Sequence, residues 1–263
     1  MLTLTHVSFA TTEQLFNYKF SGFRLREFPG YSHDQWGIKA HNRPWIDEMG
    51  RFSRGHRVIE VGGAYSRLPE YFHENYGVEA WIGDDFGMGD KDGLWSRWGN
   101  PQELPGKYPT VKYVFEPFGK FDGKYQSQYF DRIFSVSTLE HIPFENRLDV
   151  FKDMNRCLKP GGRQLHTIDI STSWRKLLFS SMVDCVPGIK HLSWNGQSEI
   201  RSWINIIRQS GVKISAAVPS PLRLFNREVL VESPDVIYRF YPPIDNPKQY
   251  MPAASLLVVI EDL

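Results

Sequence analysis

Residues 57–66 read Arg57-Val-Ile-Glu-Val-Gly-Gly-Ala-Tyr-Ser66, an apolar run followed by two glycines and then by small or polar residues. The β-branched side chains of its first half are typical of a buried parallel strand. The Gly62-Gly63 pair would let the backbone turn sharply and approach a ligand closely before a helix begins. We therefore expect a strand, a tight turn and a helix over residues 67–76, with a nucleotide-like cofactor lying at the turn.

A second strand and turn follow directly. Residues 78–82 read Val78-Glu-Ala-Trp-Ile82, and Asp84 and Asp85 come at the carboxyl end of this expected strand. In an open α/β sheet, an acid about 20 residues past a glycine turn accepts hydrogen bonds from a ribose diol. A solvated acidic turn is the alternative. The glycine turn also lacks the third glycine of the G-x-G-x-x-G dinucleotide fingerprint, so the turn alone is equally compatible with an ordinary tight turn.

Two later segments carry a resemblance to a known family. The first reads Tyr129-Phe-Asp-Arg-Ile-Phe-Ser-Val-Ser-Thr-Leu-Glu-His-Ile-Pro143, and the second reads Asp153-Met-Asn-Arg-Cys-Leu-Lys-Pro-Gly-Gly162. Both resemble hallmark segments of class I S-adenosylmethionine-dependent methyltransferases, in order and spacing, from Arg57 to about Ile170. The Pro-Gly-Gly run is also a physical stop signal, because proline and glycine do not continue the helix expected over residues 146–158.

The resemblance implies an α/β fold, a doubly wound Rossmann-like sheet of about seven strands that is mostly parallel and has a C-terminal antiparallel strand. It also implies an enzyme with S-adenosyl-L-methionine as its cofactor. The family's first motif usually has a second, separated glycine, and Ala64 stands in its place here. We expect this turn to bind the cofactor with a slightly altered backbone.

Site residues follow from the same resemblance. It assigns the amino-acid part of the cofactor to the turn and the ribose hydroxyls to one of the two acids, of which Asp85 aligns slightly better. The methionine end should pass near the backbone around Ser135 to Ser137, and adenine should lie near residues 116–122. The expected cofactor-binding residues are Glu60, Gly62, Gly63, Ala64, Asp84, Asp85, Ser135 and Ser137.

His141 is the first candidate for a general base. It comes just past the fourth strand, where the resemblance puts the mouth of the active site, and an imidazole titrates near neutral pH. The alternative is that Glu140 and His141 only shape the pocket. His166 and Asp169 are three positions apart on a strand and so face opposite sides, which argues against a metal ion bound by both. We expect His166 to be buried, Asp169 to form a hydrogen bond with the substrate, and no metal to be bound.

The composition limits the possible partners and the compartment. Lys plus Arg total 31 against 30 for Asp plus Glu, and the formal net charge of +1 offers no basic field for a phosphate backbone, so nucleic acid is not an expected partner. Two cysteines predict neither a disulfide framework nor a cysteine metal site, which fits a reducing cytoplasm. The first ten residues do not read as a signal peptide, and no membrane span is expected.

The chain reads as a single methyltransferase domain over residues 1–263, with additions around a cofactor-binding core at 57–170. We expect an N-terminal extension or lid over 1–41, and insertions near the substrate at 171–197 and 219–252. Other expected elements are a surface loop at 87–110, helices at 173–182 and 198–210, and a closing antiparallel hairpin of strands 212–218 and 254–260.

These expectations lead to a cytoplasmic methyltransferase that acts on an oxygen or nitrogen of a small polar molecule, such as a sugar or a natural product. A protein or RNA methyltransferase is the alternative enzyme, and it predicts an extended groove or a basic strip. A non-catalytic cofactor-binding or partner subunit with the same fold is a further alternative, as is other chemistry on this fold. Aromatic residues of the 219–252 insertion could also support a homodimer.

Overall fold

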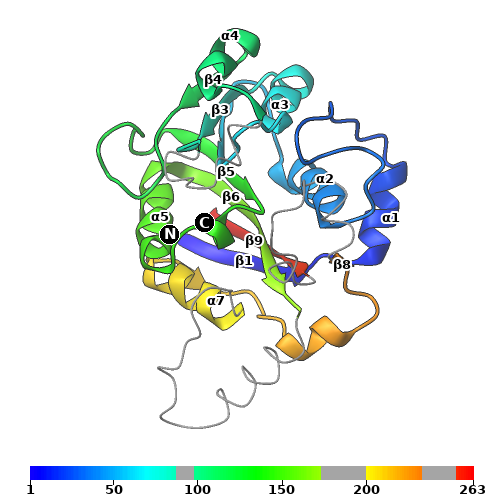
Figure 1. The fold of residues 1–263 in the computed structure, drawn as a ribbon. Coiled ribbons are helices and arrows are strands. Elements are labelled where there is room, and N and C mark those ends of the chain that lie inside the picture. The colour runs from blue at the N-terminus through cyan, green and yellow to red at the C-terminus, as the bar shows by residue number, and fades with distance from the viewer. Residues whose placement is uncertain (87–97, 173–199, 233–252) are drawn as a thin grey trace.

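The computed structural model describes residues 1–86, 98–172, 200–232 and 253–263 (Figure 1). These residues form helices and strands that build one mixed α/β sheet structure. In chain order they are β1 (Leu2–Phe9), α1 (Thr12–Phe20), α2 (Ile38–Gly50), β2 (Arg57–Val61), α3 (Leu68–Tyr76), β3 (Glu79–Gly83), α4 (Leu104–Lys107), β4 (Val111–Val114), β5 (Phe130–Val136), α5 (Phe144–Cys157), β6 (Leu158–Ser171), α7 (Ile200–Gln209), β7 (Lys213–Ile214), β8 (Val231–Glu232) and β9 (Ala253–Asp262).

The sheet has the strand order β4-β3-β2-β5-β6-β9-β1-β7, and β8 pairs with β9. The first five strands of this order run parallel to one another. The chain runs outward from β2 through β3 to β4, then returns to β5 on the other side of β2. The boundary between β2 and β5 is therefore the topological switch point, where open α/β sheets bind ligands outside the carboxyl ends of their strands. The predicted doubly wound, mostly parallel sheet is confirmed.

The far half of the sheet differs from the prediction. β9 is antiparallel to β6 on one side and to β1 on the other, and β7 pairs only with β1. The predicted hairpin of strands 212–218 and 254–260 is therefore wrong, because β1 lies between them. Residues 2–9 are likewise a strand of the sheet rather than part of a lid. Their apolar side chains Leu4, Val7 and Phe9 are buried, which is the physical reason for their place in the sheet.

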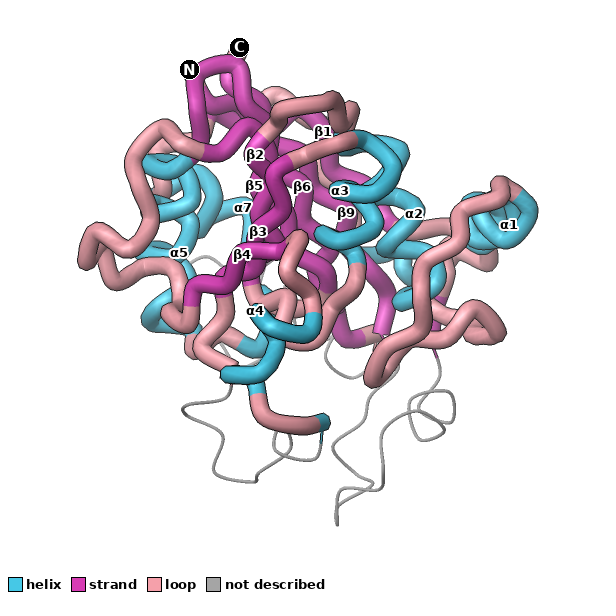
Figure 2. The backbone as a smooth tube through the Cα atoms, turned by 90° about the horizontal axis from the view of Figure 1, so that it is seen from above, coloured by secondary structure: helices cyan, strands magenta, loops and turns pink. Residues whose placement is uncertain are grey.

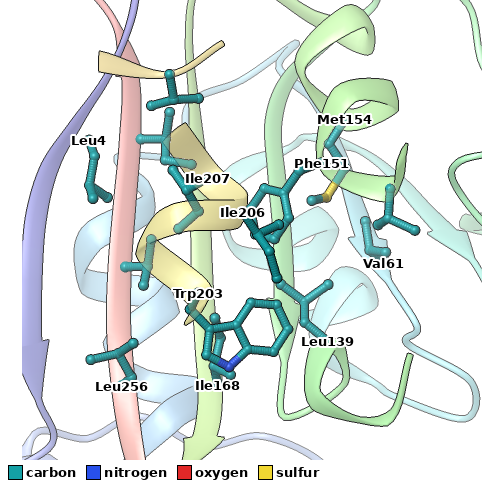
Figure 3. Close-up of a cluster of buried hydrophobic side chains, with 14 of the residues drawn as sticks. Leu4, Val61, Leu139, Phe151, Met154, Ile168, Trp203, Ile206, Ile207 and Leu256 are labelled. Atoms are coloured by element: carbon teal, nitrogen blue, oxygen red, sulfur yellow. The ribbon is translucent and has the colours of Figure 1, made fainter. Parts of the chain in front are cut away.

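Helices cover both faces of the sheet. Figure 2 shows α5 and α7 on one side of the strands and α2 and α3 on the other. Each side has its own buried core, one around Phe151 and Trp203 and the other around Phe72 and Trp45. Figure 3 shows Trp203 and Ile207 of α7 among side chains of the sheet and of α5. Burying one such side chain contributes about 1.5–3 kcal/mol, so α7 is held mainly by its apolar face.

Most helices of the cofactor-binding core agree with the sequence within two residues. α3, α5 and α7 occupy the predicted positions 67–76, 146–158 and 198–210. The helix predicted at 173–182 lies outside the described residues, as do 87–97 of the predicted loop and 233–252 of the second insertion. Among the helices that the structure describes, none is both long enough and apolar enough to span a membrane.

Candidate active site

The glycine turn lies at the switch point and touches the segment that follows β5. Gly62 has a φ of +68°, and a Cβ atom there would overlap the side chain of Thr138. The Thr138 hydroxyl donates a hydrogen bond to the Gly62 carbonyl oxygen at 3.1 Å. Only glycine accommodates both the left-handed backbone and this close approach. The first glycine of the motif thus joins the ends of two neighbouring strands.

Asp84 fixes the other side of the turn. Its carboxylate accepts the backbone N–H of Ala64 at 2.8 Å and that of Phe86 at 2.6 Å. Ala64 itself has a φ of +43°, a left-handed conformation that costs an alanine about 1–2 kcal/mol. Burial raises the pKa of Asp84 to about 6, although both backbone hydrogen bonds favour the charged form. Because Asp84 ties the turn to the end of β3, the half-buried Asp85 is the acid better placed to meet a ligand.

Glu60 is buried directly beneath the turn. One of its carboxylate oxygens, Oε2, is shielded from solvent and has no hydrogen-bond partner among the described residues. Burial raises the pKa of Glu60 to about 7, while a hydrogen bond from Ser66 and the charge of Arg43 act in the opposite direction. A Cβ on Gly63 would lie 3.0 Å from the Glu60 Cγ atom, so the second glycine leaves room for this carboxyl group.

The two predicted serines have different surroundings. The Ser135 hydroxyl is fully buried and hydrogen-bonded to Nδ1 of His166 at 2.9 Å, and Nε2 of His166 bonds Gln164 at 3.2 Å. Burial lowers the pKa of His166 to about 3, so the ring is neutral, in line with the expected buried histidine. Ser135 can therefore offer a ligand only its backbone. Ser137 has a φ of +49° and accepts a hydrogen bond from Asn42 at 3.3 Å.

His141 ends a short 3-10 turn, Leu139–His141, just past β5. Its side chain is 78% exposed, and its Nε2 lies 3.7 Å from Oε1 of Glu140. Surrounding protein nevertheless desolvates the ring and, together with the Lys39 charge, lowers the pKa of His141. A neutral, accessible imidazole at the carboxyl end of β5 is chemically suited to accept a proton.

Several polar residues near this edge were not predicted from the sequence. Asn42 of α2 donates to Ser255 of β9 at 2.8 Å, and Ser255 is 3.4 Å from Asp169 of β6. Lys39, one turn earlier on α2, forms an ion pair with Asp169 at 3.6 Å. The available signal was the run His41-Asn42-Arg43 between the apolar residues Ala40 and Pro44-Trp45-Ile46 of α2, because such polar residues are buried only where they have partners.

Aromatic side chains flank the end of β3. Phe86 packs with Phe115 and Tyr113 at ring-centroid distances of 5.0 and 6.3 Å, and Tyr65 packs edge-on to Phe86. Tyr125 lies so close to Gly83 that a Cβ there would overlap its hydroxyl, and that hydroxyl donates to the Glu116 carbonyl. These contacts bring the segment at 116–122 next to the two acids after β3.

A polar cavity of about 290 Å³ lies elsewhere, between residues 22–26 and α3. Arg26 there pairs with Glu70 at 3.7 Å and with Glu74 at 3.1 Å, and Arg67 also pairs with Glu70. Its basic side chains are thus largely matched by acids. It does not form a basic strip of the kind that binding to RNA would need.

Comparisons with known proteins bear on this geometry. Residues 101–165 match the methyltransferase domain family. A protein provisionally assigned as a sarcosine dimethylglycine methyltransferase, from Galdieria sulphuraria, has a similar structure, with a TM-score of 0.54, 13% identity, and coverage of 95% of this chain and 98% of that chain. The chain therefore shares its fold with this methyltransferase structure. No curated protein matches it in sequence.

Two further class I methyltransferase structures agree. Phosphoethanolamine N-methyltransferase 2 of Haemonchus contortus, solved with S-adenosyl-L-methionine, has a TM-score of 0.52 at 15% identity, and the match covers 95% of this chain and 57% of that one. A methyltransferase assigned provisionally from Bacillus halodurans has a TM-score of 0.53 at 10% identity, covering 84% and 98% of the two chains. At such identities the likeness concerns the fold. With the domain match, it supports an S-adenosylmethionine-dependent methyltransferase.

Proposed function

We propose that this chain transfers a methyl group from S-adenosyl-L-methionine to an oxygen or nitrogen of a small polar molecule. The observation that carries the proposal is the turn at Gly62, with the unsatisfied Oε2 of Glu60 beneath it and Asp85 at the end of the next strand. A buried carboxylate oxygen without a donor is costly, and the ammonium group of a bound amino acid would supply that donor.

The residues present fit the cofactor along its length. Glu60 and the turn through Ala64 would hold the amino-acid part. Asp85 would accept hydrogen bonds from the ribose hydroxyls, while Asp84 keeps the turn in shape through two backbone amides. The segment at 116–122, together with the aromatic side chains around Phe86, would border adenine.

When bound, S-adenosylmethionine would supply an electrophilic methyl group on a sulfonium. The acceptor atom would take this methyl group in line, and S-adenosylhomocysteine would be the leaving group. The protein then has to align the acceptor and remove its proton where the acceptor's pKa requires it. His141 would take that proton, because its ring is accessible and its pKa is held below the usual value. The acceptor would lie outside the carboxyl ends of β5 and β6, next to the polar side chains from α2 and β9.

The choice of a small polar acceptor rests on charge. The net charge of +1 gives no general attraction to a polymer backbone, and the polar groups near Asp169 match a ligand that hydrogen-bonds through several atoms. Within the described residues, the groups that could recognise an acceptor are concentrated at this one edge of the sheet.

Calorimetric titration with S-adenosylmethionine and S-adenosylhomocysteine tests the cofactor site. We expect wild-type protein to bind both, and Asp85→Ala to bind about 10–100-fold more weakly, because a hydrogen bond to a charged group contributes about 1.5–3 kcal/mol. The matched control is Asp149→Ala on the exposed face of α5, which should bind like wild type. If wild-type protein binds neither compound, the proposal fails; if it binds but methylates nothing in an acceptor screen, a non-catalytic subunit is favoured.

A further inference from the structure

Two buried carboxylates in the described part of the chain have oxygens without a hydrogen-bond partner: Glu60 and Glu140. Other buried acids have partners, which are arginine side chains for Glu70 and backbone amides for Asp153 and Asp84. Asp153 accepts the N–H of Gly119 at 2.8 Å, and Asp84 accepts two amides. The Glu60 oxygen belongs to the glycine turn and has a proposed role there. Glu140 is outside that turn, and its unsatisfied state needs a separate explanation.

Glu140 is the more extreme of the two. Its side chain is only 10% exposed, both of its carboxylate oxygens are shielded from solvent, and neither has a hydrogen bond of normal geometry. The backbone amides of Glu140 and Asp169 lie near enough to favour its charged form only slightly. Burial, and then the charge of Asp169, raise the pKa of Glu140 well above its usual range. A carboxyl group in such surroundings does not stabilise the fold, because hydrogen bonds do not offset the cost of desolvating its charged form.

Charged groups surround Glu140. Lys39 forms an ion pair with Asp169 at 3.6 Å, with both side chains 19% exposed, and its ammonium also acts on Glu140. The guanidinium of Arg147 donates to the backbone carbonyls of Glu140 and Ile142 rather than to the Glu140 carboxylate. Glu140 and Asp169 are therefore two neighbouring acids, and both feel the charge of Lys39.

Glu232 is a third acid here, on which the Lys39 and Asp169 charges act, and it has a structural role. Glu232 of β8 accepts the backbone N–H of Ile38 at 3.2 Å and so caps the first turn of α2, which has no side-chain cap of its own. Gly37 makes room for it, because a Cβ there would lie 2.9 Å from the Glu232 carboxyl carbon. Glu232 thus accepts a backbone N–H at 3.2 Å, whereas neither carboxylate oxygen of Glu140 has a hydrogen bond of normal geometry among the described residues.

We propose that Glu140, beside Asp169, is the acceptor subsite of this enzyme and that it binds a cationic amine on the acceptor. The proposal rests on the methyltransferase function proposed above and names its substrate class. An ammonium group donates several hydrogen bonds and carries a charge that is attracted to the two neighbouring acids, whereas a hydroxyl group supplies only a donor. The position fits, because Glu140 comes two residues after Thr138, which lies against the cofactor turn at Gly62.

The test uses the full chain saturated with S-adenosylhomocysteine, so that cofactor binding is measured first and by itself. Three pairs of probes that differ only in an amine or a hydroxyl group are then titrated: ethanolamine and ethylene glycol, glucosamine and glucose, and phenethylamine and phenethyl alcohol. The variants are Glu140→Gln, which keeps the shape and removes the charge, and the matched control Glu145→Gln on the exposed start of α5.

We expect the amine of at least one pair to bind about tenfold or more tightly than its alcohol. Glu140→Gln should abolish this preference without changing affinity for S-adenosylhomocysteine, and Glu145→Gln should leave both unchanged. Equal binding of amines and alcohols, no binding of any amine, or an amine preference that survives Glu140→Gln would overturn the inference while leaving the methyltransferase proposal intact. Failure to bind S-adenosylhomocysteine would overturn the methyltransferase proposal and the inference with it. The comparison of amine with alcohol is made on wild-type protein, so it does not depend on how well a variant folds.

Discussion

Replacing Gly62 by alanine should destabilise the protein through two separable effects. The left-handed φ of +68° costs an L-residue about 1–2 kcal/mol. The new methyl group would also overlap the Thr138 side chain, and such overpacking costs about 1–3 kcal/mol. We therefore expect Gly62→Ala to lower the free energy of unfolding by about 2–5 kcal/mol.

Gly55 offers a matched control for the backbone effect. It has a φ of +84°, and a Cβ there would meet nothing within 4 Å, so Gly55→Ala should cost only about 1–2 kcal/mol. Thr138→Ser in the Gly62→Ala background should recover most of the difference, because serine lacks the overlapping methyl group yet keeps the hydroxyl that bonds Gly62. Urea denaturation of the four proteins measures both terms. If Gly62→Ala costs no more than Gly55→Ala, the close contact between turn and Thr138 is refuted.

Three further outcomes test the site. The free energy of unfolding should fall as the pH rises from about 4.5 through about 7, because burial raises the pKa of Glu60 to about 7 and disfavours its charged form in the folded state. Denaturation at several pH values measures this dependence. Glu60→Gln should remove about 3 kcal/mol of it. Ser135→Ala should destabilise the protein by about 1–3 kcal/mol in denaturation, because the buried Nδ1 of His166 loses its partner. Cofactor affinity measured by calorimetry should stay unchanged, and a loss of affinity would show that the Ser135 side chain takes part in binding. His141→Ala should slow turnover about 100-fold with little change in cofactor affinity, and unchanged turnover would remove its assignment as base.

The sequence predicted the part of the fold whose signals are local. Residues 57–170 contain strands, turns and helices that follow one another closely, and each carries its own start and stop residues. β1 was missed as a strand of the sheet because its partner β9 is far away in sequence and because a register shift between Leu4 and His6 interrupts its alternation of apolar side chains. The hairpin prediction failed for the same reason, since nothing near residues 212–218 indicates that another strand lies between them and β9.

The candidate site, like the fold, has a part that the sequence predicts and a part that it does not. The residues of the glycine turn and the acids after β3 could be predicted, because a family resemblance and the strand pattern both point to them. Lys39 and Asn42 could not, because their relation to Asp169 and Ser255 exists only after α2 packs against β6 and β9. Nor does any sequence pattern reveal that the Asp84 carboxylate accepts two backbone amides while neither oxygen of Glu140 has a hydrogen bond of normal geometry among the described residues.

The position of β9 between β6 and β1 sets an order of assembly. Val7 pairs with Val258, so this contact closes a loop of almost the whole chain, and contacts of such long range form slowly. The glycine turn needs only residues that lie between β2 and the segment just after β5. Ser255, which joins Asn42 to Asp169, arrives with β9. We therefore expect a refolding chain to form the glycine turn before it brings Ser255 next to Asp169.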